Sequence, residues 1–410
     1  MTATPAVPTG FDPTDPDVCQ TAIPQEEFLA LRSTAPVWWV EQEPHARAGF
    51  LDTGFWAISK HADVSAVSKN SKDFSSAENG AIIRFGPDMT RDQIELQRIM
   101  LINQDPPDHT RTRQLISRGF TPRSINALHS VLVERADRII DDALAKGEGD
   151  FVSEVAAELP LQAIADLLGV PQEDRRKLFD WSNQMLAQDD PEYGGQPDVA
   201  AAEILGYAMG MAEDRRKNPQ DDIVTKLIQA DINGNALGED EFGYFVIMLA
   251  VAGNETTRNA ITHGMHAFFQ NPDQWELYKQ QRPVTAVDEI IRWATPVTVF
   301  QRTALNDVVV GDQQVRQGER VGIFYASANH DEDVFTDPSR FDVLRDPNPH
   351  VSFGGHGAHY CIGANLARLE VQVMFNAIAD RMPDIAQTGD PRRLRHGWIN
   401  GIKELPVRYA

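Results

Sequence analysis

The sequence predicts a mostly helical protein with a small β-rich part. Apolar residues recur at helical spacing through residues 124–270, and the longest such pattern runs from Glu239 to Gln270. Short runs of aromatic and β-branched residues elsewhere indicate strands. We therefore expect one domain over residues 1–410. Its β-rich part covers mainly residues 35–60 and 296–325 plus a C-terminal turn, and its helical part covers about residues 105–293 and 361–382.

Charge and cysteine content exclude several classes of protein. A formal net charge of −22 over 410 residues repels nucleic acids and anionic membranes, so we expect neither as a partner. Two cysteines far apart exclude a disulfide framework and fit a soluble protein of a reducing cytoplasm. We expect no membrane span, because no apolar run is long enough, and no signal peptide, because no basic residue precedes Arg32.

The first elements of the chain follow from local pattern. A helix is expected over Gln25–Thr34, and the runs 37–40 and 55–59 flank a loop ending in Asp-Thr-Gly, which is typical of a β-hairpin. Between residues 76 and 103 the pattern is interrupted by glycine and proline beside an apolar set that includes Ile82 and Phe85. Apolar loops of this kind often line a pocket.

A basic segment follows in this acidic chain. Residues 105–107, Asp-Pro-Pro, start a helix, and four arginines but no acidic residue lie between His109 and Arg123, counting Arg123 itself. His109 and Arg113 are four residues apart and share one helix face, where together they can hold an anionic group. A solvated basic face is the alternative.

The long helical pattern contains an interruption at Gly253. A glycine inside a helix costs about 1 kcal/mol relative to alanine, and a glutamate such as Glu255 costs more if it is buried and not paired. Ala252, Gly253 and Thr256 share one face, so a small gap with a hydroxyl group would open beside whatever that face covers. A satisfied kink in the core is the alternative.

Two weaker signals lie downstream. Glu289 and Arg292 are three residues apart on a helix, within reach of an ion pair, although such pairs are common by chance. Residues 296–302 indicate a strand whose apolar side chains suit the wall of a substrate pocket. The chain closes with a glycine-bounded turn that carries Trp398.

Cys361 lies where a glycine-rich loop turns into a helix. The glycines between Gly354 and Gly357 allow positive φ and a close approach of the backbone to a flat ligand. Apolar residues at helical spacing follow from Ile362 to Val373. Amide groups at a helix start stabilise a thiolate, so we expect the pKa of this thiol to be lowered. The sulfur is a candidate metal ligand or nucleophile.

Three interpretations of this loop are open. As a zinc site it offers His350, His356, His359 and Cys361, but their spacing matches none of the usual short zinc patterns. An inert cysteine in a glycine-rich loop is the second interpretation. In the third, Cys361 is the single axial ligand of a haem and the glycines lie against the porphyrin.

The order of these motifs resembles that of the cytochrome P450 monooxygenases. The run Phe353-Gly, then Gly-x-His359-x-Cys361-x-Gly363, is similar to the haem-binding signature of that family, although Phe353 lies one residue further from the cysteine than in the commonest form. The run Ala-Gly-Asn-Glu-Thr-Thr at 252–257 is similar to the family's oxygen-binding groove. The Asp-Pro-Pro segment resembles its propionate-binding helix.

This resemblance implies a haem b protein of the cytochrome P450 fold, with Cys361 as the axial ligand of the iron. Glu255 and Thr256 match the family's proton-delivery pair, and Glu289, Arg292 and Arg340 would form a buried network that braces the thiolate loop. His109 and Arg113 would bind one propionate and Arg302 the other. The full set of haem contacts implied is His109, Arg113, Ala252, Arg302, Phe353, His359, Cys361 and Gly363.

Longer stretches, such as 294–304 and 397–403, are similar to actinobacterial steroid side-chain monooxygenases. They imply hydroxylation by O₂ of the terminal side-chain methyl group of cholesterol or cholest-4-en-3-one. The alternatives are an ω-hydroxylase of methyl-branched lipids and a haem-binding sensor or carrier without turnover. Candidate walls of the substrate pocket are Ile82, Phe85, Met248, Ala252, Val297, Val299 and Trp398.

Electrons must come from other proteins in this interpretation. No dinucleotide fingerprint and no flavin domain is visible in the sequence, so the resemblance implies a separate ferredoxin and its reductase. Arg111, Arg118 and Arg123 would be left to attract such an acidic partner.

Overall fold

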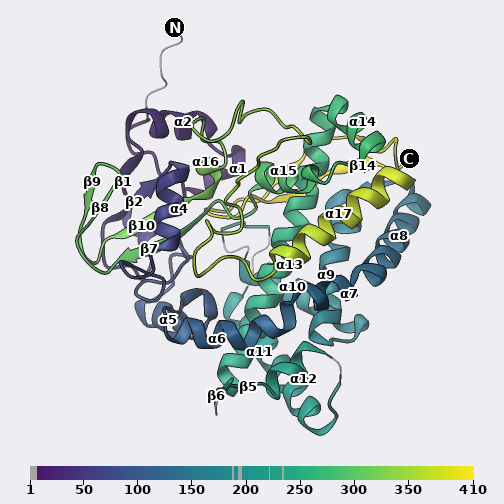
Figure 1. Ribbon diagram of the computed structural model, residues 1–410, viewed down its shortest axis with the longest axis horizontal. Helices are drawn as coiled ribbons and strands as arrows, with labels where there is room; N and C mark the ends of the chain where they lie inside the picture. The colour runs from purple at the N-terminus through teal and green to yellow at the C-terminus, as the bar shows by residue number, and fades with distance from the viewer. Residues whose placement is uncertain (1–6, 187–188, 193–195, 221, 233–234) are drawn as a thin grey trace.

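The computed structural model describes residues 7–186, 189–192, 196–220, 222–232 and 235–410 (Figure 1). It confirms the predicted fold class, because helices form most of the molecule and the strands are short. None of the helices in these ranges is long and apolar enough to cross a membrane. The α-helices are α1 (Pro16–Thr21), α2 (Gln25–Thr34), α3 (Pro44–Arg47), α4 (His61–Lys69), α5 (Arg91–Leu96), α6 (Asp108–Ser117), α7 (Pro122–Ala127), α8 (His129–Lys146), α9 (Glu158–Leu168), α10 (Arg175–Leu186), α11 (Pro197–Lys217), α12 (Ile223–Ile228), α13 (Glu239–Gln270), α14 (Pro272–Gln281), α15 (Thr285–Ala294), α16 (Tyr325–Ala328) and α17 (Ala364–Arg381).

The largest sheet has five strands in the order β1-β2-β10-β7-β3. Strands β1 and β2 pair antiparallel, which confirms the predicted hairpin. Strand β10 then joins parallel to β2 and antiparallel to β7. The strands are β1 (Val37–Glu41), β2 (Gly54–Ile58), β3 (Phe74–Ser75), β4 (Glu148–Asp150), β5 (Asp231–Ile232), β6 (Asn235–Ala236), β7 (Val299–Ala304), β8 (Val308–Val310), β9 (Gln313–Val315), β10 (Arg320–Phe324), β11 (Ala386–Gln387), β12 (Arg392–Arg393), β13 (Ile402–Glu404) and β14 (Pro406–Arg408).

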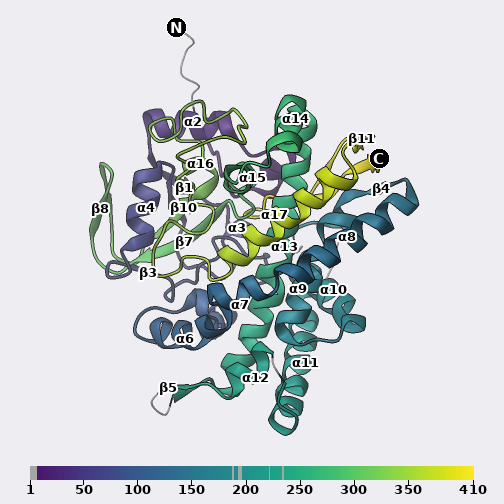
Figure 2. The ribbon, with the colours of Figure 1, turned by 45° about the vertical axis from the view of Figure 1, so that its right-hand side comes forward.

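Helix α13 runs through the middle of the molecule for 32 residues, with the bounds that the apolar pattern predicts. Helices α9, α10, α11, α15 and α17 pack against it, and α17 crosses it (Figures 1 and 2). The glycine at 253 does not break the helix. A Cβ atom there would lie 2.4 Å from Cδ1 of Ile164 in α9, so a larger residue would force the Ile164 side chain to shift.

The apolar core divides between the helices and the sheet. The largest cluster joins side chains of α8, α9, α11, α13, α15 and α17. Two smaller clusters cover opposite faces of the five-stranded sheet, because successive strand residues point to opposite sides. In β7, for example, Val299 belongs to one of these clusters and Phe300 packs against the other.

A buried ion-pair network connects α15 with the chain that follows α16. Glu289 and Arg292, both 0% exposed, are joined by two hydrogen bonds of 2.7 and 2.8 Å. Nε of Arg345 and the side-chain amide of Asn348 each donate to the same carboxylate at 3.1 Å. Three side chains, together with the backbone amide of Asp342, therefore satisfy a carboxylate that water cannot reach.

The expectation that Arg340 is the third member of this network is wrong. Its side chain is exposed, and the guanidinium group that contacts Glu289 is that of Arg345. Arg340 contributes only its carbonyl oxygen, which accepts from Arg292 at 3.3 Å. A turn closed by a 2.9 Å hydrogen bond from the Arg340 amide to Asp337 directs this carbonyl group inward and the side chain outward.

The network reaches the glycine-rich loop through Asn329. The carbonyl oxygen of Asn329 accepts from Arg292 at 2.8 Å, and its side chain accepts from the amide of Val351 at 2.8 Å. The same side chain donates to the hydroxyl of Ser352 at 2.8 Å, which donates in turn to a carbonyl oxygen of α15. The loop is therefore anchored to the helix that carries the ion pair.

We expect Glu289→Gln to lower the free energy of unfolding by roughly 3–5 kcal/mol, because it leaves Arg292 charged, buried and without its carboxylate. Urea unfolding followed by circular dichroism measures this change. Glu213→Gln is the matched control, since Glu213 pairs with Lys217 on the exposed side of α11 and its loss should leave the midpoint unchanged. Equal midpoints for Glu289→Gln and wild type would contradict the bracing role.

Candidate active site

The glycine-rich loop places Cys361 just before α17. Gly354 and Gly355 have φ angles of 98° and 64°, in the region that favours glycine. The amide of Cys361 donates to the carbonyl oxygen of Phe353 at 2.9 Å, which closes the loop. The cysteine lines a cavity bounded by this loop, α6, α13, α17 and β7.

The loop histidines do not form a metal site with Cys361. His350 contacts Asp288 at 3.0 Å, and Nε2 of His359 lies 3.1 Å from the hydroxyl of Ser76. Over the described ranges, no group of three or more His, Cys, Asp or Glu side chains could hold a metal ion.

Burial raises the pKa of the Cys361 thiol, contrary to the expectation from its position at a helix start. The amide of Gly363 and the charges of Arg113 and Arg368 lower the pKa, but desolvation of the thiolate is the larger effect. The expectation is wrong because it counted the helix start and not the protein packed around the cavity to which Cys361 is exposed. A cationic partner in the cavity would stabilise the thiolate, which favours a metal ligand over a free nucleophile.

Nitrogen-bearing side chains lie together in the cavity lining. His109 and Arg113 come from α6, Arg302 from β7 and His359 from the loop. The ring centroids of His109 and His359 are 4.2 Å apart. Arg113 and Arg302 donate to backbone carbonyl oxygens at 2.5 and 2.6 Å.

These basic groups are arranged for an anion. Burial lowers the pKa of the Arg113 and Arg302 guanidinium groups, and it lowers the pKa of His109 to about 4, with a further contribution from the charge of Arg113. Nε2 of His109 is buried without a hydrogen-bond partner. A bound carboxylate would satisfy this nitrogen and offset the desolvation of the two cations.

Helix α13 contributes the face that the sequence singled out. Ala252, Gly253, Thr256 and Thr257 all line the cavity. The hydroxyl of Thr256 donates to the carbonyl oxygen of Ala252 at 2.7 Å. Its oxygen keeps lone pairs that can accept a hydrogen bond from a molecule in the cavity.

Glu255 is not part of the cavity lining in the described structure. Its carboxylate, 3% exposed, forms an ion pair with Arg258 and accepts from the side chain of Asn259 at 2.8 Å. Neighbouring residues of an α-helix point about 100° apart, so Glu255 and Thr256 face different sides of α13. A proton that passes from Glu255 to Thr256 therefore needs an intervening group.

The apolar residues expected around the substrate divide into two sets. Met248, Ala252 and Val297 line the cavity. Val299 does not, because it is 0% exposed and packs into the cluster on the other face of the sheet. Alternation along β7 places Phe300 in the lining instead. The expectation for Val299 is wrong by one residue.

Ile82, Phe85 and Trp398 also lie outside the lining of this cavity, as far as the described residues define it. The ring centroid of Trp398 lies 6.2 Å from that of Phe300, so Trp398 contacts a lining residue without being part of the lining. Phe85 packs against Phe50 with ring centroids 5.7 Å apart.

Sequence reasoning missed many of the lining residues, among them Phe300, Tyr325 and Glu370. Strand alternation could have identified Phe300. Glu370 had a weaker signal, a carboxyl group within the apolar helix that follows Cys361. Tyr325 had none, because it lies at the junction of β10 and α16.

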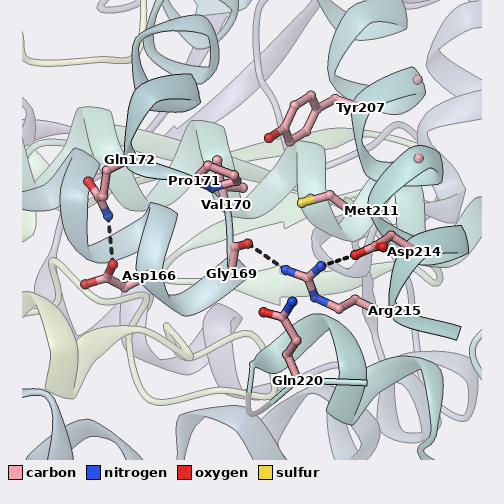
Figure 3. A pocket seen from close by; sticks show the side chains of 12 residues that line it. Asp166, Gly169, Val170, Pro171, Gln172, Tyr207, Met211, Asp214, Arg215 and Gln220 are labelled. Carbon is pink, nitrogen blue, oxygen red and sulfur yellow. Dashed lines mark hydrogen bonds and ion pairs between the residues drawn. The ribbon is translucent and has the colours of Figure 1, made fainter. Parts of the chain in front are cut away.

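A second cavity lies between α9, α11 and the segment before α12 (Figure 3). Gly206 and Gly210 leave open space along α11. The polar groups around it are paired with one another: Arg215 contacts Asp214 and the carbonyl oxygen of Gly169, and Gln172 donates to Asp166. Among its described lining residues, none is a buried donor without a hydrogen-bond partner, unlike His109 in the cavity at Cys361.

Comparison with known proteins gives a consistent set of relatives. The cytochrome P450 family model matches residues 160–381. A steroid C26-monooxygenase of Rhodococcus jostii (strain RHA1) is 61% identical over 99% of this chain and 86% of its own length. One from Mycobacterium tuberculosis (strain ATCC 25618 / H37Rv) is 60% identical over 99% and 94%. A methyl-branched lipid omega-hydroxylase of the latter strain is 40% identical over 93% and 90%. The solved structure of Mycobacterium marinum cytochrome P450 CYP268A2 with pseudoionone has a TM-score of 0.89 at 35% identity and covers 100% of both chains.

We expect Val299→Ala and Val297→Ala to differ in stability although they remove the same methyl groups. Val299 lies in a closed core, so its truncation should cost about 2 kcal/mol of unfolding free energy. Val297 faces the cavity, and its truncation should cost less than half as much. Urea unfolding of both variants measures the difference. A larger loss of unfolding free energy for Val297→Ala than for Val299→Ala would contradict this assignment and indicate that Val299 lines the cavity.

Proposed function

The protein belongs to the cytochrome P450 family, and we propose that it is a haem-thiolate monooxygenase that hydroxylates the terminal side-chain methyl group of a sterol. The proposed substrate is cholesterol or cholest-4-en-3-one. The observation that carries this proposal is a cavity with Cys361 in its lining, in a chain more similar to steroid C26-monooxygenases than to the omega-hydroxylases of branched lipids.

Haem b fits the residues of this cavity. Its two propionates would satisfy Nε2 of His109 and supply the counter-charges that Arg113 and Arg302 lack. When bound, a haem with a thiolate ligand would use two electrons to activate O₂, so that one oxygen atom is inserted into a C–H bond. The residues that would hold it are Cys361 as the iron ligand together with His109, Arg113, Ala252, Arg302, Phe353, His359 and Gly363.

Thr256 is the residue placed to move protons within the cavity. Its hydroxyl is oriented by the carbonyl oxygen of Ala252 and can accept a proton from one side and pass one to the other. Glu255 supplies protons from behind the helix, where Arg258 and Asn259 fix its carboxylate. Water is the intervening group that their different directions require.

The apolar lining decides which carbon reacts. A tertiary C–H bond at the branch of a sterol side chain is weaker than a terminal one, so terminal hydroxylation requires a site that restricts the approach. Met248, Val297 and Phe300 supply such a wall. A flexible isoprenoid end passes between these side chains more easily than a rigid ring system, which stays further from Cys361.

Electrons come from a ferredoxin and its reductase in this proposal. Arg118 and Arg123 are exposed near the junction of α6 and α7 and would attract an acidic ferredoxin. Arg111, expected to join them, pairs instead with Glu241 of α13. We place the protein in the cytoplasm, where the free thiols of Cys19 and Cys361 stay reduced.

An ω-hydroxylase of methyl-branched lipids is the second candidate, because such enzymes are also relatives. Both substrate classes end in a branched alkyl chain, which the same apolar lining accepts. A haem-binding sensor without turnover is less favoured, since it has no use for Thr256 in the cavity lining.

With ferredoxin and reductase supplied, we expect the purified holoprotein to convert cholest-4-en-3-one to the terminal side-chain alcohol. Gas chromatography with mass spectrometry identifies the product against synthetic standards. A methyl-branched fatty acid tested in parallel should turn over more slowly. Ring hydroxylation, or mainly the tertiary alcohol, would rule out the proposed geometry, and faster turnover of the fatty acid would favour the second candidate.

Cys361→His should abolish the red-shifted Soret band of the reduced carbonyl complex, because that band requires a thiolate ligand. Visible spectroscopy of the reduced protein under carbon monoxide measures it. Cys19→Ala is the matched control and should keep the band, since Cys19 is buried beside Pro13, where its thiol donates to a carbonyl oxygen. Persistence of the band in Cys361→His would show that another residue binds the iron.

A further inference from the structure

Glu370 is a buried acidic residue that the proposed mechanism does not use. It lies on α17, is 1% exposed and lines the cavity at Cys361. Within the described residues, it is the one carboxyl side chain in that lining. Thr257 of α13 also lines the cavity, and its side chain lowers the pKa of Glu370.

The described structure holds three buried glutamates, and Glu370 differs from the other two. Glu289 is paired with Arg292 and Arg345, and Glu255 is paired with Arg258. In the described part of the chain, no cation forms an ion pair with Glu370, and its Oε1 atom has no hydrogen-bond partner. A carboxylate in such a position is strongly disfavoured, so the neutral acid is the stable form.

Burial raises the pKa of Glu370 to about 8, and the side chain of Thr257 lowers it by a smaller amount. A carboxyl group with a raised pKa is protonated below that value, so Glu370 carries a proton at neutral pH. It loses this proton only in alkaline solution.

Most charged side chains on neighbouring elements are paired with groups other than Glu370, and Arg113 and Arg302 are the cations that share its cavity. None of them is a cause of the raised pKa of Glu370, which is set by burial and by Thr257. Its proton affinity therefore responds chiefly to the charge held in the cavity. The neighbouring ion pairs are Glu255 with Arg258 on α13, Asp288 of α15 with Arg368, Glu289 with Arg292 on α15, Asp137 and Asp141 of α8 with Arg381, and Asp166 of α9 with Arg135. His263 of α13 contacts a backbone carbonyl oxygen. Arg113 and Arg302 lie in the cavity lining.

We propose that Glu370 is the site of proton uptake linked to reduction of the haem bound at Cys361. This inference rests on the proposed function. When one electron from an iron–sulfur donor enters the cavity, the added negative charge favours the neutral form of Glu370 over its carboxylate. An ionised Glu370 then takes up one proton from solvent for one electron, and charge is balanced. A Glu370 that is already neutral keeps its proton, and the electron enters alone.

This linkage gives the reduction potential a defined dependence on pH. Around neutral pH the potential should be constant, because Glu370 is protonated in both redox states. In alkaline solution it should fall with increasing pH, with one proton taken up per electron, until Glu370 is ionised in both states. Removal of the titrating group should abolish this fall.

The test is a spectroelectrochemical titration of the holoprotein from about pH 6 to about pH 9, the range around a carboxyl group raised to this extent. Wild type should show the alkaline fall, and Glu370→Gln should have a constant potential. Glu370→Asp, which still titrates, should restore the fall. Glu276→Gln is the matched control, because it removes an exposed carboxylate paired with Lys279 and should behave as wild type.

Infrared spectroscopy of the wild-type holoprotein keeps the inference testable if Glu370→Gln does not fold. The C=O stretch of a protonated carboxylic acid should be present at neutral pH and fade over the interval in which the potential falls. A band that is absent at neutral pH, or unchanged through that interval, would overturn the inference. So would a pH-independent wild-type potential, or the same dependence in Glu370→Gln as in wild type.

Failure of the proposed function is distinguishable from failure of this inference. A purified protein without a haem-thiolate spectrum would contradict the proposed function and the inference together. A haem-thiolate protein whose potential does not follow the ionisation of Glu370 would contradict the inference alone.

Discussion

The buried ion pair between Glu289 and Arg292 is the interaction on which the geometry of the site depends. Both charges are removed from water, so every hydrogen-bonding position around them must be filled. Arg345, Asn348 and backbone carbonyl oxygens fill these positions only in one conformation of the chain after α16. The loop before Cys361 is tied to that conformation, so the cost of leaving a buried charge unpaired fixes where the sulfur lies.

The cost of burying an unpaired charge also acts inside the cavity, where the titratable groups of the described lining are not paired with one another. There the half-buried Arg113 and the buried Arg302 have no carboxylate partner in the described part of the chain, and Glu370 is buried without a cation. Burial disfavours the charged form in each case, yet a guanidinium group stays protonated while a carboxyl group becomes neutral. The cavity is thus basic in a protein of net charge −22, which suits an anionic cofactor. Net charge describes the surface and says little about such a site.

Much of the fold could be predicted from local pattern. The bounds of α2 and α13 follow from apolar spacing, and the first hairpin follows from two short strand patterns around a turn. The loop around Cys361 and the small face of α13 carried their chemistry in short motifs. These signals are local because helix and strand periods, turn residues and glycine positions depend on neighbours within a few residues.

The sequence by itself determined the elements, the thiol at the start of α17 and the group of basic residues on α6. Only the tertiary structure decided that Arg345 rather than Arg340 reaches Glu289, that Phe300 rather than Val299 lines the cavity, and that burial raises the pKa of Cys361. Each of these depends on which side of a turn or strand faces the interior and on how deeply an atom lies. Direction and depth are set by contacts between segments distant in the chain, because desolvation depends on everything packed around an atom and not on its neighbours in sequence.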